Sequence, residues 1–149
     1  MNVKKVVIFD IDGTLADNNH RQCFVSDGRK EWEKFFSLMG DDVPVLSVIE
    51  LCQVLFTSGN YEIHIFSGRP ERYRRLTEQW LAWNDIPSLP LSMRKDGDSR
   101  PDAEIKEEML LKLQAEGKQI AFVVDDRKTV VEMWRKHGIV CLQCAEGDL

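Results

Sequence analysis

Short apolar runs rich in β-branched residues recur along the chain, and most of them end in small or acidic residues. Runs of this length and composition are typical of strands that are buried on both faces of a parallel sheet. We expect strands at residues 3–9, 61–66, 89–93, 120–124 and 139–142. Three of these strands are followed at once by Asp10, Ser67 and Asp125.

The segments between these runs carry apolar residues at the spacing of a helix. The first begins after Pro44, ends near Gly59 and has one broad apolar face formed by Val45, Val48, Ile49, Leu51, Cys52 and Leu55. Further helices are expected at 69–83, 101–116 and 128–136. Because parallel strands need crossover connections, this alternation predicts an α/β fold with a Rossmann-like parallel sheet flanked by helices.

The length and composition predict one globular domain over residues 1–149. The apolar run near the N-terminus has only four residues before a charge, which is too short for a signal peptide or a membrane span. We therefore expect a soluble cytoplasmic protein with reduced cysteines and no membrane partner. The net charge of -5 argues against non-specific binding of nucleic acid over the whole surface, although local basic groups occur at 69–75 and 94–100.

The polar residues at the strand ends are expected to face one site, because ligands of an open parallel sheet bind beyond the carboxyl ends of its strands. Asp10 is suited to attack phosphorus and form an aspartyl-phosphate, provided that a cation reduces the repulsion between two anions. Asp125 and Asp126 can hold that cation, since adjacent carboxylates at a strand end otherwise repel one another. Mg²⁺ is the expected ion because it prefers hard oxygen ligands.

Further polar residues supply the other requirements of phosphate-ester hydrolysis. Asp12, two residues after the nucleophile, would protonate the leaving oxygen and later activate water. Gly13 permits a sharp turn close to the phosphate, and the Thr14 hydroxyl adds a hydrogen-bond donor. Ser67 would bond a phosphoryl oxygen, and Lys106 would neutralise charge on the nucleophile and the phosphate.

Each of these motifs alone has an ordinary structural explanation. D-x-D-G is often a turn, S-G is a common loop dipeptide, and a lone lysine is usually a solvated helix residue. Their order along the chain and their positions at strand and helix ends favour a single catalytic site instead.

The ordered set Asp10-x-Asp12-Gly-Thr, Ser67, Lys106 and Asp125-Asp126 resembles the haloacid-dehalogenase-like phosphatase superfamily. Longer segments at 10–21, 67–71, 94–102, 105–108 and 125–135 resemble the 3′-phosphatase domains of phage-type polynucleotide kinase/phosphatases. The resemblance implies a haloacid-dehalogenase-like fold and a magnesium-dependent reaction. It also implies that the first Asp is the nucleophile, that the second is the acid and base, and that the metal site comprises Asp10, Asp12, Asp125 and Asp126.

By the same resemblance, four further residues occupy functional positions of the family: Arg21, Arg69, Asp102 and Lys106. Arg21, Arg69 and Gly68 would bind the phosphate or the charge of the transition state. Asp102 would orient the nearby lysine or a phosphate-binding group. The guanidinium of Arg127 is expected to brace the two metal-site carboxylates.

The sequence departs from the bifunctional relatives in having no G-x-x-x-x-G-K-[ST] loop, so we expect no kinase domain. The segment 16–42 is too short for a separately folded cap, so the cap should be minimal. An open site admits polymer ends, whereas a small free substrate usually needs a closing cover. Trp80, Trp83 and Trp134 are interpreted as core residues, and Tyr73, which lies among arginines, is the best candidate for stacking on a base.

The leading hypothesis is a polynucleotide 3′-phosphatase that removes the terminal 3′-phosphate from DNA or RNA, with the nucleic-acid 3′ end as its partner. The alternative is a nucleotidase or another small-molecule phosphatase of the same superfamily. Two other classes of function remain open: a receiver-like signalling module and a non-catalytic protein that binds nucleic-acid ends.

Overall fold

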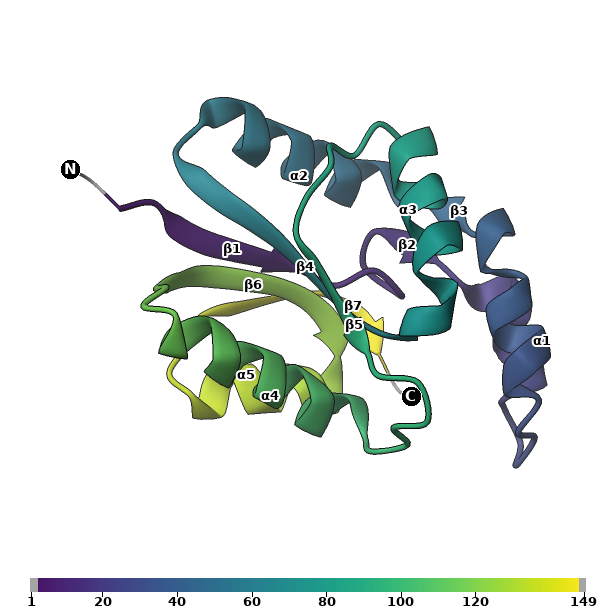
Figure 1. The fold of residues 1–149 in the computed structure, drawn as a ribbon. Coiled ribbons are helices and arrows are strands. Elements are labelled where there is room, and N and C mark those ends of the chain that lie inside the picture. The colour runs from purple at the N-terminus through teal and green to yellow at the C-terminus, as the bar shows by residue number, and fades with distance from the viewer. Residues whose placement is uncertain (1–2, 148–149) are drawn as a thin grey trace.

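The computed structural model describes residues 3–147, which form a five-stranded parallel sheet in the order β5-β4-β1-β6-β7 (Figure 1). The strands are β1 (Lys5–Phe9), β4 (Tyr61–Pro70), β5 (Leu91–Arg94), β6 (Ile120–Arg127) and β7 (Cys141–Gly147). One face is covered by α2 (Leu46–Ser58) and α3 (Arg74–Trp83), and the other by α4 (Asp102–Ala115) and α5 (Lys128–Lys136). The α/β fold with helices on both faces is confirmed.

The central strand β1 is buried on both faces, and its residues 6–9 are at most 1% exposed. Val7 and Phe9 pack into the core beneath α2 and α3, whereas Val6 and Ile8 pack into the core beneath α4 and α5. Such a strand needs apolar side chains at every position, which explains the continuous run in the sequence. The strand brings Asp10, the residue that follows it, to the middle of the carboxyl edge of the sheet.

Two strands continue past the ends that the apolar pattern predicts. β4 runs to Pro70 instead of residue 66, and β6 runs to Arg127 instead of residue 124. The predicted helix start at residue 69 is therefore wrong, because a 3-10 turn, η3 (Glu71–Tyr73), follows the strand before α3 begins. β7 likewise begins at residue 141 and not at 139. Both β4 and β6 continue into residues that are polar or charged, several of which are buried, so the apolar pattern marks only the apolar part of each strand.

Two side chains on the predicted apolar faces of the helices are more exposed than the helical spacing suggests. Trp80 and Trp134 are core residues as predicted, at 4% and 0% exposed. Trp83 is 86% exposed, however, because the buried face of α3 is limited to Thr77, Trp80 and Leu81, and the last residue of the helix lies beyond it. Leu51 is 37% exposed at the edge of the apolar face of α2. Trp83 was therefore wrongly assigned to the core, and Leu51 lies at the margin of the predicted apolar face.

Short elements connect β1 to α2 where larger superfamily members could carry a cap. They are β2 (Ala16–Asp17), the 3-10 helix η1 (Asn19–Phe24), α1 (Trp32–Ser37), the 3-10 turn η2 (Met39–Asp41) and β3 (Val43–Pro44). β2 pairs antiparallel with β3. The expected minimal cap is confirmed. Among residues 3–147, no helix combines the length and the apolar character needed to cross a membrane.

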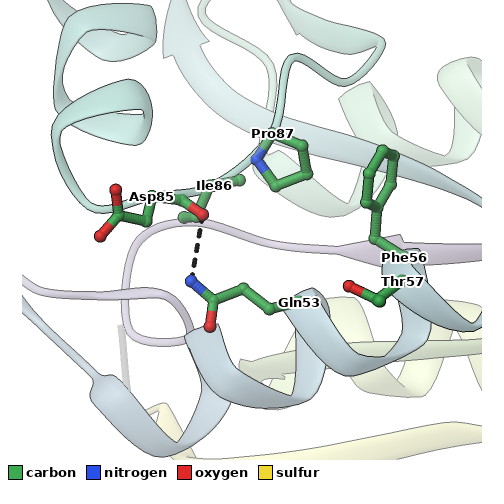
Figure 2. A pocket seen from close by; sticks show the side chains of 6 residues that line it. All are labelled: Gln53, Phe56, Thr57, Asp85, Ile86 and Pro87. Carbon is green, nitrogen blue, oxygen red and sulfur yellow. Dashed lines mark hydrogen bonds between the residues drawn. The ribbon is translucent and has the colours of Figure 1, made fainter.

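A surface hollow lies between α2 and the turn after α3, away from the strand ends (Figure 2). It is lined by Gln53, Phe56, Thr57, Asp85, Ile86 and Pro87. The side-chain amide of Gln53 donates to the carbonyl oxygen of Asp85 at 3.0 Å and joins the two walls. None of the predicted site residues lines this hollow, so the candidate site lies elsewhere.

Candidate active site

Asp10, Asp125 and Asp126 form a cluster at the carboxyl ends of the neighbouring strands β1 and β6. One carboxylate oxygen from each residue lies within 4.8 Å of the others. The parallel pairing of Phe9 with Val124 sets this arrangement, because it brings the residues that follow these two positions to the same height. Asp10 is 6% exposed and Asp125 is 1% exposed, so two of the three carboxylates have lost most contact with water.

Lys106 of α4 is the cation nearest to this cluster among the described residues. Its ammonium group donates to Asp10 Oδ1 at 2.7 Å and to Asp125 Oδ2 at 2.9 Å, and the side chain is 2% exposed. Burial lowers the pKa of Lys106, but attraction to the two carboxylates outweighs it and raises the pKa above its usual value. The indole N–H of Trp134 also donates to Asp125 Oδ2, at 3.3 Å. Lys106 is therefore charged and held in place.

The electrostatics of the cluster favour a bound divalent cation. Burial, reinforced by the charge of Asp125, raises the pKa of Asp10 well above its usual value despite the opposing effect of Lys106. Burial and the same neighbour also raise the pKa of Asp126. One ammonium group cannot balance three carboxylates, and carboxylate oxygens are the ligands that hard divalent cations prefer. The three side chains thus make a divalent-metal site.

Asp12 lies beside this cluster, but two arginines hold its carboxylate. Arg21 Nη2 donates to Asp12 Oδ1 at 2.6 Å, and Arg69 donates through Nη2 to Oδ1 at 2.8 Å and through Nε to Oδ2 at 3.0 Å. Burial would raise the pKa of Asp12, but Arg69 and then Arg21 lower it to about 2. The Asp12 carboxylate is therefore ionised, and it is not part of the three-residue cluster, although the sequence predicted it as a fourth metal ligand.

Arg21 and Arg69 are 0% and 1% exposed, and both guanidinium groups are occupied by protein acceptors. Besides Asp12, they share the carboxylate of Asp42. Arg21 also donates to the carbonyl oxygen of Phe35 at 3.1 Å. In this structure the two arginines position Asp12, and their direct binding of phosphate remains a prediction.

Asp42 is a site residue that sequence reasoning missed. Its carboxylate accepts from Arg21 at 2.8 Å through both Nε and Nη2, from Arg69 at 3.2 Å and contacts His20 at 2.7 Å. The residue is 4% exposed, and its carbonyl oxygen accepts from the Trp80 indole at 2.9 Å. The sequence carries no motif at Asp42, and the one available signal was an acidic pair directly before β3.

Ser67 and Gly68, near the end of β4, lie at the same edge of the sheet. Ser67 is fully buried, and its hydroxyl accepts from the backbone N–H of Arg69 at 3.1 Å. Gly68 lies against Asp102, so that a Cβ added at Gly68 would be 2.5 Å from Asp102 Oδ1. A side chain at this position would therefore displace the carboxylate.

Asp102 forms ion pairs with Arg94 and Arg127. The prediction that the guanidinium of Arg127 braces the metal-site carboxylates is wrong, because this guanidinium pairs with the carboxylate of Asp102 instead. The backbone N–H of Arg127 does donate to Asp125 Oδ1, at 3.4 Å. Asp102 thus orients two arginines at the rim of the site, and no hydrogen bond joins it to Lys106 among the described residues.

Gly13 and Thr14 complete the wall around the carboxylates. The hydroxyl of Thr14 lies 3.2 Å from Asp10 Oδ2 and 3.2 Å from Asp126 Oδ1. Gly13 has a φ of 85°, which favours glycine, and a Cβ there would lie 2.1 Å from Asp126 Oδ2. The sharp turn predicted after Asp12 therefore requires glycine at position 13 for two reasons: the positive φ and the closeness of the Asp126 carboxylate.

We expect Gly13→Ala to weaken the binding of Mg²⁺ or Mn²⁺ about 10- to 100-fold, because the new methyl group must displace the Asp126 carboxylate. Isothermal titration calorimetry measures this change. Gly97→Ala is the matched control, since Gly97 has a φ of 81° but no atom within 4 Å of the added Cβ. It should lower stability by about 1–2 kcal/mol without changing metal affinity. Wild-type affinity in Gly13→Ala would contradict the assignment of Asp126 as a ligand.

Comparisons with known proteins agree with this geometry. A family model described as "Polynucleotide kinase PNKP phosphatase domain" matches residues 4–149. A chain in the structure of the Pnkp1/Rnl/Hen1 RNA repair complex is 32% identical, with a TM-score of 0.83, over 99% of this chain and 44% of that chain. A second structure of the Pnkp1/Rnl/Hen1 complex gives 33% identity and a TM-score of 0.84, over 99% of this chain and 47% of that chain.

A more distant structure shares the fold alone. A hydrolase from Streptococcus pneumoniae TIGR4 is 14% identical, with a TM-score of 0.62, over 96% of this chain and 94% of that chain. The present chain therefore spans nearly the whole of that hydrolase, but less than half of the two chains in the Pnkp1/Rnl/Hen1 structures.

Proposed function

Since this chain belongs to the family of polynucleotide kinase PNKP phosphatase domains, within the haloacid-dehalogenase-like superfamily, we propose that it is a polynucleotide 3′-phosphatase. It would remove the terminal 3′-phosphate from DNA or RNA and leave a 3′-hydroxyl. The observation that carries this proposal is the family match over residues 4–149, combined with Asp10, Lys106 and the acidic pair gathered at one sheet edge. The minimal cap leaves that edge open to the end of a polymer.

Asp10 is the nucleophile of the proposed reaction. Its carboxylate oxygen forms a bond to phosphorus while the bond from phosphorus to the 3′-oxygen breaks, which gives an aspartyl-phosphate. Water then attacks the phosphorus, inorganic phosphate leaves and the Asp10 carboxylate is restored. Lys106, at 2.7 Å from Asp10, keeps the nucleophile oriented and offsets the charge that gathers around it.

Asp12 moves the protons in both steps. In the free protein the arginines keep it ionised, which is the form that accepts a proton from the attacking water. The approach of a negatively charged phosphate raises the pKa of a nearby carboxyl group. Binding of substrate therefore favours the protonated form of Asp12, which gives its proton to the leaving 3′-oxygen.

The carboxylates of Asp10, Asp125 and Asp126 would hold the magnesium ion. When bound, Mg²⁺ supplies positive charge that reduces the repulsion between the nucleophile and the phosphate. Thr14, Ser67 and the backbone around Gly13 and Gly68 line the same edge, where they would donate hydrogen bonds to phosphoryl oxygens. Two arginines lie at the rim of the site: Arg94 donates to the carbonyl oxygen of Gly68, and Arg127 pairs with Asp102.

We propose that these 149 residues form a phosphatase domain. The similar chains in the Pnkp1/Rnl/Hen1 structures are more than twice as long as the matched region, and the assembly that contains them is an RNA repair complex. Because no phosphate-cradling loop of the kinase type occurs among the 149 residues, we assign this chain the phosphatase step alone. Its proposed partner is a nucleic-acid 3′ end.

A substrate panel tests this function. We expect release of inorganic phosphate from 3′-phosphorylated oligonucleotides with Mg²⁺, and little release from 5′-phosphorylated oligonucleotides or from a 3′-mononucleotide. Chelation by EDTA should abolish the activity and added Mg²⁺ should restore it, because the three clustered carboxylates repel the phosphate in the absence of a cation. A protein that hydrolyses the mononucleotide far better than the oligonucleotide would instead be a nucleotidase.

A further inference from the structure

Helix α1 lies on the side of the molecule where the strands end (Figure 1). A series of aromatic rings runs from this helix to the turn that precedes α3. The rings of Trp32 and Phe36 are stacked with centroids 5.9 Å apart and planes inclined by 24°. Phe36 is stacked in turn on Tyr73 at 5.2 Å and 30°. Three rings from two separate segments therefore lie nearly parallel, and we call Trp32, Phe36 and Tyr73 the aromatic series.

Only one end of the aromatic series is open. Tyr73 has Phe36 on one side and the guanidinium of Arg72 at 5.1 Å from its ring centroid. Phe36 lies between its two partners. Trp32 is 48% exposed, and its described ring partners are Phe36, stacked on it, and Phe35, which meets it edge-on at 5.6 Å. Another planar ring can therefore extend the series by stacking on Trp32.

Two hydrogen bonds tie the two segments of the aromatic series together. Glu33 of α1 accepts from Arg72 at 2.6 Å and from the Tyr73 hydroxyl at 3.0 Å, which ties α1 to the turn after β4. The guanidinium of Arg72 also offsets the negative charge of the Glu33 carboxylate. A preorganised aromatic surface loses little conformational entropy when a base stacks on it.

The same helix is joined directly to the catalytic carboxylates. The guanidinium of Arg21 lies 4.3 Å from the ring centroid of Phe35 and donates to the carbonyl oxygen of that residue at 3.1 Å. Arg21 also donates to Asp12 at 2.6 Å. One arginine thus connects the proposed acid and base to the helix that carries Trp32, which places the aromatic series beside the route of a polymer that leaves the site.

The charges around Trp32 suit a polyanion with exposed bases. Arg29, Lys30 and Lys34 are exposed next to it in the chain. The acidic neighbours are Asp27, Glu31 and Glu33, of which Glu33 is paired with Arg72. Lys34 is 66% exposed and lies 3.5 Å from Glu31. Surfaces that bind single strands combine cationic groups that follow the backbone with aromatic side chains on which bases stack.

We propose that Trp32, at the open end of the aromatic series, stacks on a base of the single strand that leads to the 3′-phosphate. The inference rests on the proposed function and adds the form of the substrate: an unpaired 3′ end whose bases are free to stack. Base stacking on an aromatic side chain tolerates any sequence, because every base has a π-face. The surface would therefore select polynucleotides over small phosphate esters without selecting a sequence.

The experiment compares Trp32→Ala with Trp83→Ala, since Trp83 is 86% exposed at the end of α3 and takes part in no ring stack among the described residues. The substrates are a single-stranded, 3′-phosphorylated decanucleotide, an abasic chain of the same length, and glycerol 2-phosphate. For the decanucleotide, Trp32→Ala should lower kcat/KM about 5- to 150-fold, mainly through KM. Trp83→Ala should match the wild type. Trp32→Phe should recover most of the loss.

The abasic chain and the small ester separate stacking from other effects. Trp32→Ala should hydrolyse both at wild-type rates, because neither presents a base. An equal loss on the abasic chain, or an equal loss in Trp83→Ala, would overturn the proposal. If Trp32→Ala fails to fold, Trp32→Leu retains apolar contact with Phe35 and Phe36 and should show the same loss. A wild-type protein that hydrolyses glycerol 2-phosphate but no 3′-phosphorylated oligonucleotide would overturn the proposed function itself.

Discussion

Asp10→Asn is expected to lower phosphate release from a 3′-phosphorylated oligonucleotide by about 10⁴-fold or more, because an amide oxygen cannot form the phosphoenzyme. The fold should be retained. Burial and Asp125 already disfavour the charge on Asp10, so a neutral side chain of the same shape relieves repulsion while Lys106 keeps its bond to Asp125. Steady-state phosphate release and thermal unfolding measure the two effects.

The control for this substitution is Asp85→Asn, which changes an exposed aspartate on the turn after α3. It should leave both activity and stability at wild-type values. Residual activity within about tenfold of the wild type in Asp10→Asn would show that another group attacks the phosphorus. Activity lost together with the thermal transition would point to a structural role and not a catalytic one.

Asp42→Ala is expected to lower the free energy of unfolding by about 3–5 kcal/mol, because it leaves two buried guanidinium groups without their shared carboxylate. Arg21 and Arg69 would then lose the partner that fixes their distance from Asp12. A displacement of Asp12 by about 1 Å is enough to lower the rate by about 10²-fold. Urea unfolding gives the stability, and kcat at saturating oligonucleotide gives the effect on the site.

The neighbouring residue supplies a close control. Asp41 is adjacent in the sequence but exposed, so Asp41→Ala should change neither quantity by a measurable amount. Asp42→Asn keeps the shape of the side chain and loses its charge, and it should fall between the wild type and Asp42→Ala. Equal stability of Asp42→Ala and Asp41→Ala would mean that the arginines do not depend on this carboxylate.

The catalytic candidates that the sequence identified share one property, which is their position at the end of an apolar run or in the first turns of a helix. Asp10 follows β1, and Asp125 follows the apolar part of β6. A central parallel strand can be recognised because burial on both faces demands a continuous run of apolar residues. The carboxyl edge of a parallel sheet then fixes which end of each run faces the ligand. Lys106 follows the same logic, because it lies in the second turn of α4.

Residues without such a local signature were assigned wrongly or not at all. Asp42 lies in a short loop, and its role depends on two arginines that are 21 and 27 positions away in the chain. Arg127 directly follows the acidic pair, yet its guanidinium turns to Asp102. Trp83 continues the helical spacing of Trp80, but it is the last residue of α3 and lies beyond the residues that pack on the core.

The sequence by itself determined the α/β architecture, the position of Asp10 at the end of β1 and the acidic pair at the end of β6, because hydrophobic periodicity and strand ends are local properties of the chain. Only the tertiary structure decided how the charges pair: Asp12 with Arg21 and Arg69, and both arginines with Asp42. It also decided which aromatic rings stack. Charged groups and rings interact through space over a few ångströms, and segments distant in the chain reach that range only after the sheet and its helices have packed.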